Sequence, residues 1–353
     1  MNSPLRRSLI PRLPHQKRTL SAFRRAFGAW APVVASVLVI TLGLFALPGV
    51  LAVDLALDDA RRPQPDFPIT VYPNEKEIIV DPAVEELLST APEGTLAGAV
   101  GFLEEGYTRV AVWVSQIPWY RQIAGIDTLF VTIRPGYREE EVAAAFGRQL
   151  GWSQAERGAF LEAVEAKDPQ LSDGQFAPGT YFVSVSKPED VANMTQERFA
   201  EQILSRYSTS TNEVVPIEDA ITIASLIERE AGGWDDMRLI SGIIWNRLFI
   251  NMNLQIDATL QYSKADNAGG EGGWWPTPRP ADKNIRHAYN TYRGPGLPPG
   301  PIATPSVAAV VAALNPTKTD CIFYFHDQYG RFHCSPTYEG HVALLKKHYG
   351  QGR

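Results

Sequence analysis

One apolar stretch of the chain ends abruptly in acidic residues. The segment Ile221–Glu230 predicts the last turns of a helix that begins near Pro216 and stops at Gly232-Gly233. Its body is apolar nearly all round, a pattern typical of a buried helix rather than a surface one. Two carboxylates, Glu228 and Glu230, nevertheless stand at its end.

The spacing around these carboxylates offers no ordinary ion pair. No basic residue lies four positions before or after Glu228 or Glu230. Glu228 also continues the apolar stripe of Ile221 and Ala224. Apolar surroundings at the negative end of a helix favour the protonated acid that general acid catalysis needs. Glu228 is therefore a candidate catalytic acid, and a solvated helix end is the alternative.

The remaining pattern predicts a mixed α+β protein of short elements. Strands are expected at 69–72, 78–80, 109–114, 129–133, 181–185 and 254–257, and on both sides of a turn at 327–330. Helices are expected at 83–88, 139–150, 153–161, 193–207, 239–248 (capped by Asp235 or Asp236), 306–314 and 341–348. Residues 68–127 suggest no chemistry, and a packing surface is expected there.

The N-terminal region has the order of charge expected of a membrane anchor. Its basic residues are Arg6, Arg7, Arg12, Lys17, Arg18, Arg24 and Arg25, with no acidic residue among them. Residues 26–53 carry no charge and are long enough to cross a bilayer. We expect a cytoplasmic tail at 1–25, a single transmembrane helix at 26–53 and everything after Asp54 outside the cytoplasm. A cleaved signal peptide is the alternative.

Composition narrows the partners. The 353 residues are 44% hydrophobic and 20% charged, which suits a packed core, and the net charge of −6 argues against nucleic acid as a partner.

Cys321 and Cys334 are the two cysteines, on either side of a predicted hairpin. A disulfide is possible in an oxidising compartment. Two free buried thiols are the slightly preferred expectation.

Several ordered motifs in the C-terminal third resemble the MltG/YceG-like family of membrane-anchored endolytic murein transglycosylases. The motifs are Ala224–Glu230, Asn246–Leu248, Leu254–Asp257, Tyr289–Tyr292 and Gly296–Ile302, with Gly174–Tyr181 resembling the loop before the catalytic region. Each is short, but their common order is specific, and the predicted anchor agrees with it.

The resemblance implies a reaction and a set of residues. Glu228 falls on the family's catalytic acid. It would cleave the β-1,4 bond between N-acetylmuramic acid and N-acetylglucosamine inside glycan strands and leave 1,6-anhydro ends, with no metal or organic cofactor. Polar residues on irregular segments are expected to bind substrate; these are Asp257, Tyr289, Asn290 and Tyr292, with Glu230 beside them. For Asp257 and Asn290, tying down loops is an equal alternative. Glu230 could instead orient Glu228 or pair with a base such as Arg247.

The resemblance and the pattern together give a domain plan. After a linker and accessory region at 54–127, residues 128–200 resemble a LysM-like module, a peptidoglycan-binding type, and 201–353 form a mixed α+β catalytic domain. A small packing subdomain is an equal alternative for 128–200. Trp274-Trp275 lie in a segment, 263–287, that departs from the family pattern; they could stack on sugar rings or plug the core.

Expected partners are glycan strands of peptidoglycan and the membrane, with the cell-wall synthesis machinery as a further candidate. We predict that Glu228 lies in a groove lined by the Tyr289–Tyr292 and Gly296–Ile302 loops. Three alternatives remain: a hydrolase with Asp257 as second carboxylate, a metal site at His326, His333 and His341, and a non-catalytic wall-binding scaffold.

Overall fold

The computed structural model describes residues 65–89 and 129–350, except residue 185 and the Asp235 side chain, together with four isolated helical positions between 34 and 43. The predicted membrane helix at 26–53 and the predicted strand at 109–114 otherwise lie outside these residues. Within the described part of the chain, no helix is both long and apolar enough to cross a membrane. Residues 65–89 and 129–350 belong to one compact unit.

The described N-terminal segment contains two short strands and a helix, as the pattern predicts. Strands β1 (Val71–Tyr72) and β2 (Glu77–Ile78) pair antiparallel and are followed by α2 (Pro82–Ser89). This segment is fastened to the C-terminal region, because Thr70 N donates to Leu314 O at 3.0 Å and Arg238 binds the Glu85 carboxylate.

The next segment has the order strand, helix, helix, strand. It comprises β3 (Leu129–Ile133), α5 (Glu139–Leu150), α6 (Gln154–Glu165) and β4 (Gly179–Val183). β3 and β4 pair antiparallel with Val131 opposite Tyr181. A core of its own, including Phe146 and Phe160, lies between the helices and the sheet. Ser153 caps α6 by accepting a hydrogen bond from Glu156 N.

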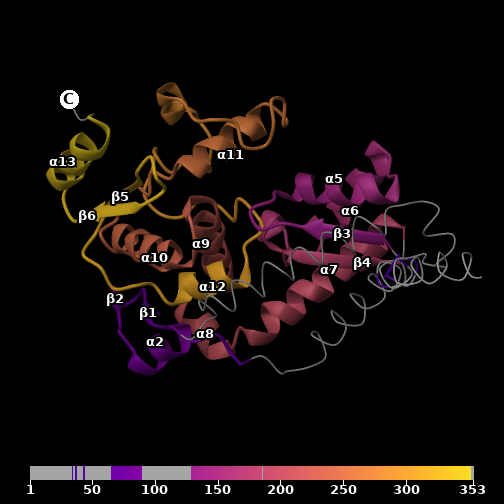
Figure 1. Ribbon diagram of the computed structural model, residues 1–353, viewed down its shortest axis with the longest axis horizontal. Helices are drawn as coiled ribbons and strands as arrows, with labels where there is room; N and C mark the ends of the chain where they lie inside the picture. Colours follow the sequence, from indigo (N-terminus) through magenta and orange to yellow (C-terminus); the bar gives the residue numbers. More distant parts are fainter. Residues whose placement is uncertain are drawn as a thin grey trace, which may run out of the picture. The chain divides into compact units, whose positions relative to one another are not determined.

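A helical region follows and is built around α9 (Figure 1). Its α-helices are α7 (Pro188–Gln202), α8 (Thr209–Val214), α9 (Ile217–Glu230), α10 (Trp234–Phe249), α11 (Asp257–Asn267) and α12 (Val307–Leu314). Short 3-10 turns lie at Ser172–Gly174, Leu204–Arg206 and Pro280–Asn284. α9 packs against α10, α11 and α12. Every residue from Ala220 to Ile227 is buried, which confirms the prediction of a core helix.

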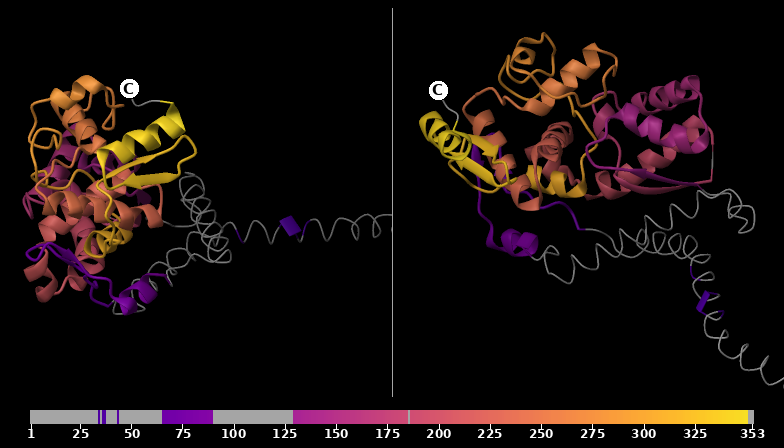
Figure 2. Two further views of the ribbon diagram at one scale, coloured as in Figure 1. Left: turned by 90° about the vertical axis from the view of Figure 1, so that its left-hand side faces the viewer. Right: turned by 45° about the horizontal axis from the view of Figure 1, so that its top comes forward.

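The chain ends in a hairpin covered by a helix. Strands β5 (Phe323–His326) and β6 (Phe332–Ser335) pair antiparallel, and α13 (Tyr338–Tyr349) lies along them (Figure 2). The predicted turn forms, since Gly330 N donates to Asp327 O at 2.9 Å.

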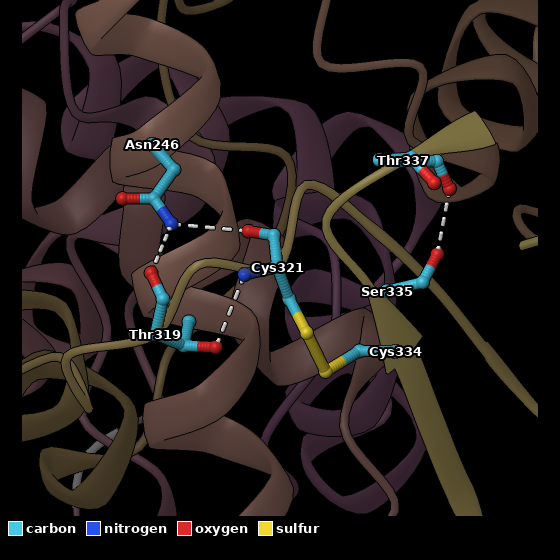
Figure 3. The surroundings of a disulfide bond; sticks show 6 residues. All are labelled: Asn246, Thr319, Cys321, Cys334, Ser335 and Thr337. Carbon is cyan, nitrogen blue, oxygen red and sulfur yellow. Dashed lines mark hydrogen bonds between the residues drawn. A yellow bond between two sulfur atoms is a disulfide. The ribbon is translucent and has the colours of Figure 1, made fainter. Parts of the chain in front are cut away.

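Cys321 and Cys334 form a disulfide, so the preference for free thiols was wrong (Figure 3). Cys321 lies just before β5 and Cys334 lies on β6, and their Cα atoms are 5.8 Å apart, within the range that a disulfide spans. Asn246 holds the approach to the hairpin, because its Nδ2 donates to Thr319 O at 2.7 Å and to Cys321 O at 3.0 Å.

Two local predictions fail. Leu254–Asp257 is not a strand: Gln255 has a φ of 52°, its backbone N–H donates to Thr291 O, and Asp257 already opens α11. The alternating burial of Leu254 and Ile256 comes from this bent segment rather than from a ladder. α10 begins at Trp234, after an N-cap at Gly233 that provides no side-chain cap, so the predicted Asp cap is also wrong.

Candidate active site

Glu228 lies where the end of α9 meets the start of α12. Its Oε2 accepts two hydrogen bonds from one residue, Ser306: from the backbone N at 2.9 Å and from the hydroxyl Oγ at 2.6 Å. Ser306 is also the N-cap of α12, where its Oγ accepts from Ala309 N at 3.1 Å. Among the described residues both hydrogen bonds to the Glu228 carboxyl go to Oε2. The side chain is partly exposed.

The proline-rich run reaches α9 one turn before Glu228. Ser225 Oγ accepts from Ile302 N at 3.0 Å and donates to Thr222 O, and Ser225 and Ile302 are both fully buried. The Ile302 end of the predicted Gly296–Ile302 loop is thus fixed to α9. Ser306 follows it within a few residues, so this attachment positions the two donors to Glu228.

Glu230 is held by different neighbours. Its Oε2 accepts from the Tyr324 hydroxyl at 2.9 Å and its Oε1 from Ala258 N at 3.3 Å. Burial raises the pKa of Glu230, and these hydrogen bonds oppose the rise. Burial also raises the pKa of Tyr324, helped by the charge of Glu230.

Arg247 does not pair with Glu230 in the described structure. Its guanidinium donates instead to backbone carbonyls, including Ile322 O at 2.7 Å and Leu254 O. Asn246 and Arg247 therefore link α10 to the start of the hairpin that carries Tyr324.

Asp257 and Tyr292 meet beside Glu230. The Tyr292 hydroxyl donates to Asp257 Oδ1 at 2.6 Å, and Asp257 directly precedes Ala258, whose N–H binds Glu230. Burial and the Asp257 carboxylate raise the pKa of Tyr292. The Tyr289–Tyr292 turn therefore reaches Glu230. Substrate binding by Asp257, Tyr292 and Glu230, and the predicted groove at Glu228, stay predictions.

Asn290 and Tyr289 serve the loop itself. The buried Asn290 amide donates to Lys283 O and Ile285 O and accepts from Tyr292 N, so both of its polar atoms are used. The Tyr289 ring lies 4.6 Å from the Tyr262 ring. These contacts support the loop-holding role for Asn290, and substrate binding by Tyr289 and Asn290 stays a prediction.

Trp275 connects α9 to the segment that follows β3. Arg229, between the two glutamates, stacks over the Trp275 ring at 3.7 Å and donates to Gly136 O at 3.3 Å. Trp275 Nε1 donates to Glu141 Oε2 at 2.9 Å. Gly136 has a φ of 78°, and a Cβ there would lie 3.0 Å from the Arg229 side chain. These contacts favour the structural role considered for Trp275.

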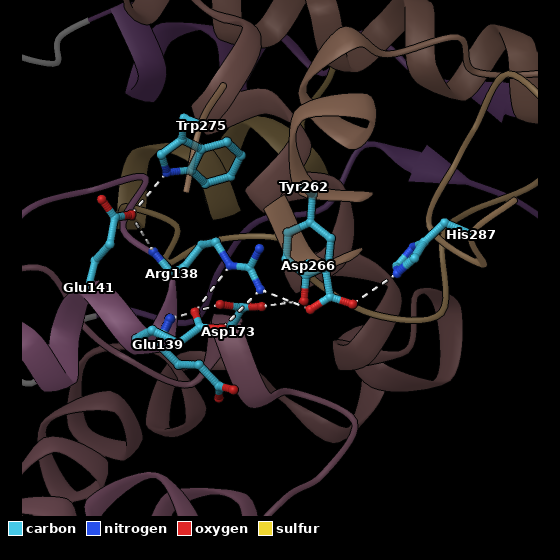
Figure 4. Close-up of polar contacts among 9 residues, drawn as sticks. Arg138, Glu139, Glu141, Asp173, Tyr262, Asp266, Trp275 and His287 are labelled. Carbon is cyan, nitrogen blue, oxygen red and sulfur yellow. Dashed lines mark hydrogen bonds and ion pairs between the residues drawn. The ribbon is translucent and has the colours of Figure 1, made fainter. Parts of the chain in front are cut away.

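A buried polar network surrounds Arg138 (Figure 4). The Arg138 side chain is 2% exposed, binds Glu140 and stacks 3.9 Å from the Tyr262 ring centroid. Asp173 accepts from Glu139 N at 2.8 Å and from the Tyr262 hydroxyl at 2.7 Å. Trp274 packs over the same guanidinium at 4.7 Å. The sequence pattern does not predict this network, because residues 138–140, Asp173 and Tyr262 are far apart along the chain.

Two carboxylic acids in this network titrate near neutral pH. Burial is the main cause in both cases. It raises the pKa of Asp173 to about 7, against the opposing charge of Arg138. It raises the pKa of Glu139 to about 8, reinforced by the neighbouring Asp173.

The three histidines considered for a metal do not form the predicted set. His326 binds Asp236 Oδ2 at 2.9 Å, and the His341 ring stacks on Phe323. Among the described residues, the side chains close enough to share an ion are instead Asp327, His333 and His348.

Comparison with known proteins decides the family. Residues 95–347 match the YceG-like family, which is more than half of the chain. The chain belongs to the YceG-like family. The matched region includes Glu228, Ser306 and the loops around them, and the mixed α+β architecture fits this family.

The YceG-like chain resembles curated proteins and a solved structure. It is 26% identical over 247 residues to the endolytic murein transglycosylase of Streptococcus pneumoniae, covering 62% of this chain and 44% of that protein. It is 29% identical over 241 residues to the endolytic murein transglycosylase of Bacillus subtilis, covering 62% of this chain and 64% of that protein. The match thus spans less than two thirds of either relative.

The solved structure supports the fold. A crystal structure of a yceG-like protein from Listeria monocytogenes aligns with a TM-score of 0.53 and 24% identity, covering 64% of this chain and 81% of that chain.

Ser306, Tyr324 and Arg229 are site residues that the sequence did not single out. A signal existed for Ser306 alone, since serine before a helix is a common N-cap.

Proposed function

We propose that this chain is a membrane-anchored endolytic lytic transglycosylase, a lyase that cuts peptidoglycan glycan strands. Its family membership and the names of its relatives support this proposal. The observation that carries it is the position of Glu228. A partly exposed carboxyl is held by one oxygen at the junction of two helices, inside the matched region.

Glu228 serves first as acid and then as base. Protonated Glu228 gives its proton to the glycosidic oxygen as the bond from that oxygen to C1 of N-acetylmuramic acid breaks. The carboxylate then takes the proton of the muramoyl C6 hydroxyl while the C6 oxygen forms a bond to C1. The product carries a 1,6-anhydro ring, and no water is consumed.

Ser306 suits this exchange. Its two donors hold Oε2, which leaves Oε1 to face the sugar. The N-terminus of α12 places its positive dipole end at the carboxylate that forms after the first proton transfer. Asp257, Tyr292 and Glu230 would contact hydroxyl and N-acetyl groups of the glycan from the neighbouring turn.

The test is mass spectrometry of muropeptides after digestion of peptidoglycan by wild type, Glu228→Gln and Glu218→Gln. Glu218 lies in the first turn of the same helix and serves as the matched control. We expect anhydro ends from wild type and Glu218→Gln, and none from Glu228→Gln. Reducing ends that incorporate labelled water would identify a hydrolase, with Asp257 as the candidate second carboxylate. Glycan binding without cleavage by wild type would identify a scaffold.

Localisation and wall binding are part of the same proposal. The basic-then-apolar order of residues 1–53 supports an anchor with the catalytic region outside the cytoplasm. The Cys321–Cys334 disulfide supports an oxidising location. The strand–helix–helix–strand order of 129–183 supports a LysM-like module that holds glycan. Protease digestion of intact and opened cells tests the orientation: the region after Asp54 should be cleaved from outside.

A further inference from the structure

A second polar cluster lies in the C-terminal hairpin and is not used by the proposed reaction. Asp327 opens the turn between β5 and β6, His333 lies on β6, and His348 lies in the last turn of α13. One carboxylate oxygen and one nitrogen from each ring all lie within 4.8 Å of one another. The two imidazole centroids are 4.2 Å apart.

The two separations that involve Asp327 are close to those of a tetrahedral ligand set, and all three donor atoms lie within 4.8 Å of one another. His333 Nε2 lies 3.0 Å and His348 Nδ1 3.7 Å from Asp327 Oδ2. Ligands at 2.0–2.1 Å from a tetrahedral Zn²⁺ stand about 3.3 Å apart, which falls between these two distances. Imidazole and carboxylate are also donors that zinc prefers, and three protein ligands with one open position are a common zinc arrangement.

The surroundings orient the carboxylate. The Asp327 side chain is 1% exposed, and its Oδ1 accepts from Tyr329 N at 2.9 Å and Arg331 N at 3.1 Å. Oδ2 is thereby directed at the two imidazoles. Arg331 Nε also reaches Oδ2 at 2.9 Å, but that side chain is 64% exposed and can move into solvent.

We propose that Asp327, His333 and His348 bind one Zn²⁺ ion, with water as the fourth ligand. His333 binds the ion through Nε2 as the Nδ1–H tautomer, so the ring proton moves from Nε2 to Nδ1, and the ion displaces Arg331 from Oδ2. It ties α13 to the β5–β6 hairpin. Tyr324 lies on the same hairpin and donates to Glu230, so the ion braces a strand that contacts the candidate active site.

The competing explanation is that Asp327 only orders the turn, with Arg331 and His333 as its donors. The Arg331→Ala variant distinguishes the zinc site from this competing explanation. If the cluster binds zinc, Arg331→Ala frees Oδ2 and should strengthen zinc binding several-fold. If Asp327 only orders the turn, the same substitution leaves zinc binding absent.

The experiment uses the untagged full chain, treated with EDTA and titrated with ZnCl₂ against a chromophoric chelator. Wild type should bind one Zn²⁺ with micromolar or better affinity, and its Tm should rise. His348→Gln and His333→Gln should weaken binding at least tenfold. His341→Gln, on the same helix but outside the set, should bind as wild type does. Co²⁺ in wild type should give the visible absorption of a tetrahedral site.

Two results would overturn the proposal. One is millimolar or absent zinc binding by folded wild type. The other is a His348→Gln variant that binds zinc as tightly as wild type does. His348→Gln is informative because its Nδ1 lies 3.7 Å from Asp327 Oδ2, beyond hydrogen-bonding distance, so the hairpin should fold without it. Circular dichroism of each variant establishes that it is folded.

Discussion

Ser306 gives both its backbone N–H and its hydroxyl to the same oxygen of Glu228, at 2.9 and 2.6 Å. The residues are far apart in sequence and belong to different helices. The contact joins the end of α9 to the start of α12, and it makes Ser306 a positioning residue for the proposed acid.

Ser306→Ala should therefore slow glycan cleavage about 5- to 30-fold, which corresponds to about 1–2 kcal/mol for a lost hydrogen bond to the reacting carboxyl. It should also lower the free energy of unfolding by about 1 kcal/mol, because α12 loses its cap. Ser153→Ala removes a similar cap from α6 and is the matched control. It should lose stability but keep its cleavage rate. Equal rates in both variants would remove Ser306 from the mechanism. Product analysis and urea unfolding measure the two effects.

Tyr324→Phe should reduce stability by about 1–3 kcal/mol. The partly buried Glu230 carboxyl loses its hydroxyl donor and keeps the N–H of Ala258. Tyr338→Phe is the control, since Tyr338 is 62% exposed, and it should leave stability unchanged. Urea unfolding at neutral pH compares the two variants. Equal midpoints would show that the Tyr324 hydroxyl contributes nothing.

Trp275→Phe distinguishes a structural role from a sugar platform. The variant keeps an aromatic ring under Arg229 but loses the donor to Glu141, so the free energy of unfolding should fall by about 1 kcal/mol. Co-sedimentation with peptidoglycan, measured in the Glu228→Gln background, should not change. Loss of sedimentation with unchanged stability would assign Trp275 to glycan binding instead.

Stability should fall as pH rises from about 5 to about 8. The pKa of Asp173 is raised to about 7 and that of Glu139 to about 8, so the folded state binds more protons than the unfolded state across this range. The stabilisation is complete below the unfolded pKa values and is lost as pH rises through the folded ones. Denaturation at a series of pH values gives the free energy of unfolding as a function of pH. This free energy should fall less steeply with pH in Asp173→Asn and in Glu139→Gln than in wild type. Glu162→Gln, an exposed change on α6, should keep the wild-type slope.

Removing the disulfide should cost about 2–4 kcal/mol, the amount expected for cross-linking a loop of this length. The cysteines are separated by 13 positions. The variant with both Cys321→Ser and Cys334→Ser should unfold at a lower urea concentration than wild type. A reductant should lower the urea midpoint of wild type and leave that of the double variant unchanged. If reductant leaves wild type unchanged, the bond does not contribute to stability.

The sequence by itself determined the local elements and the likeness to the YceG-like family. The apolar body of α9 requires burial, whichever partner covers it, and the two glutamates at its end interrupt that pattern in the sequence alone. The positions of α5 and β3 could also be predicted, because periodicity and turn residues mark where each begins and ends. These features depend on neighbours within a few positions, and such neighbours are visible in the sequence.

Only the tertiary structure decided which distant groups meet. Periodicity could not distinguish the bent Leu254–Asp257 segment from a strand, because both bury alternate side chains. It could not pair Ser306 with Glu228 or Tyr324 with Glu230, nor join Cys321 to Cys334. Each of these contacts depends on how the helices and the hairpin pack against one another. That packing is determined by the burial of many side chains together, so it cannot be predicted from the two residues that form the contact.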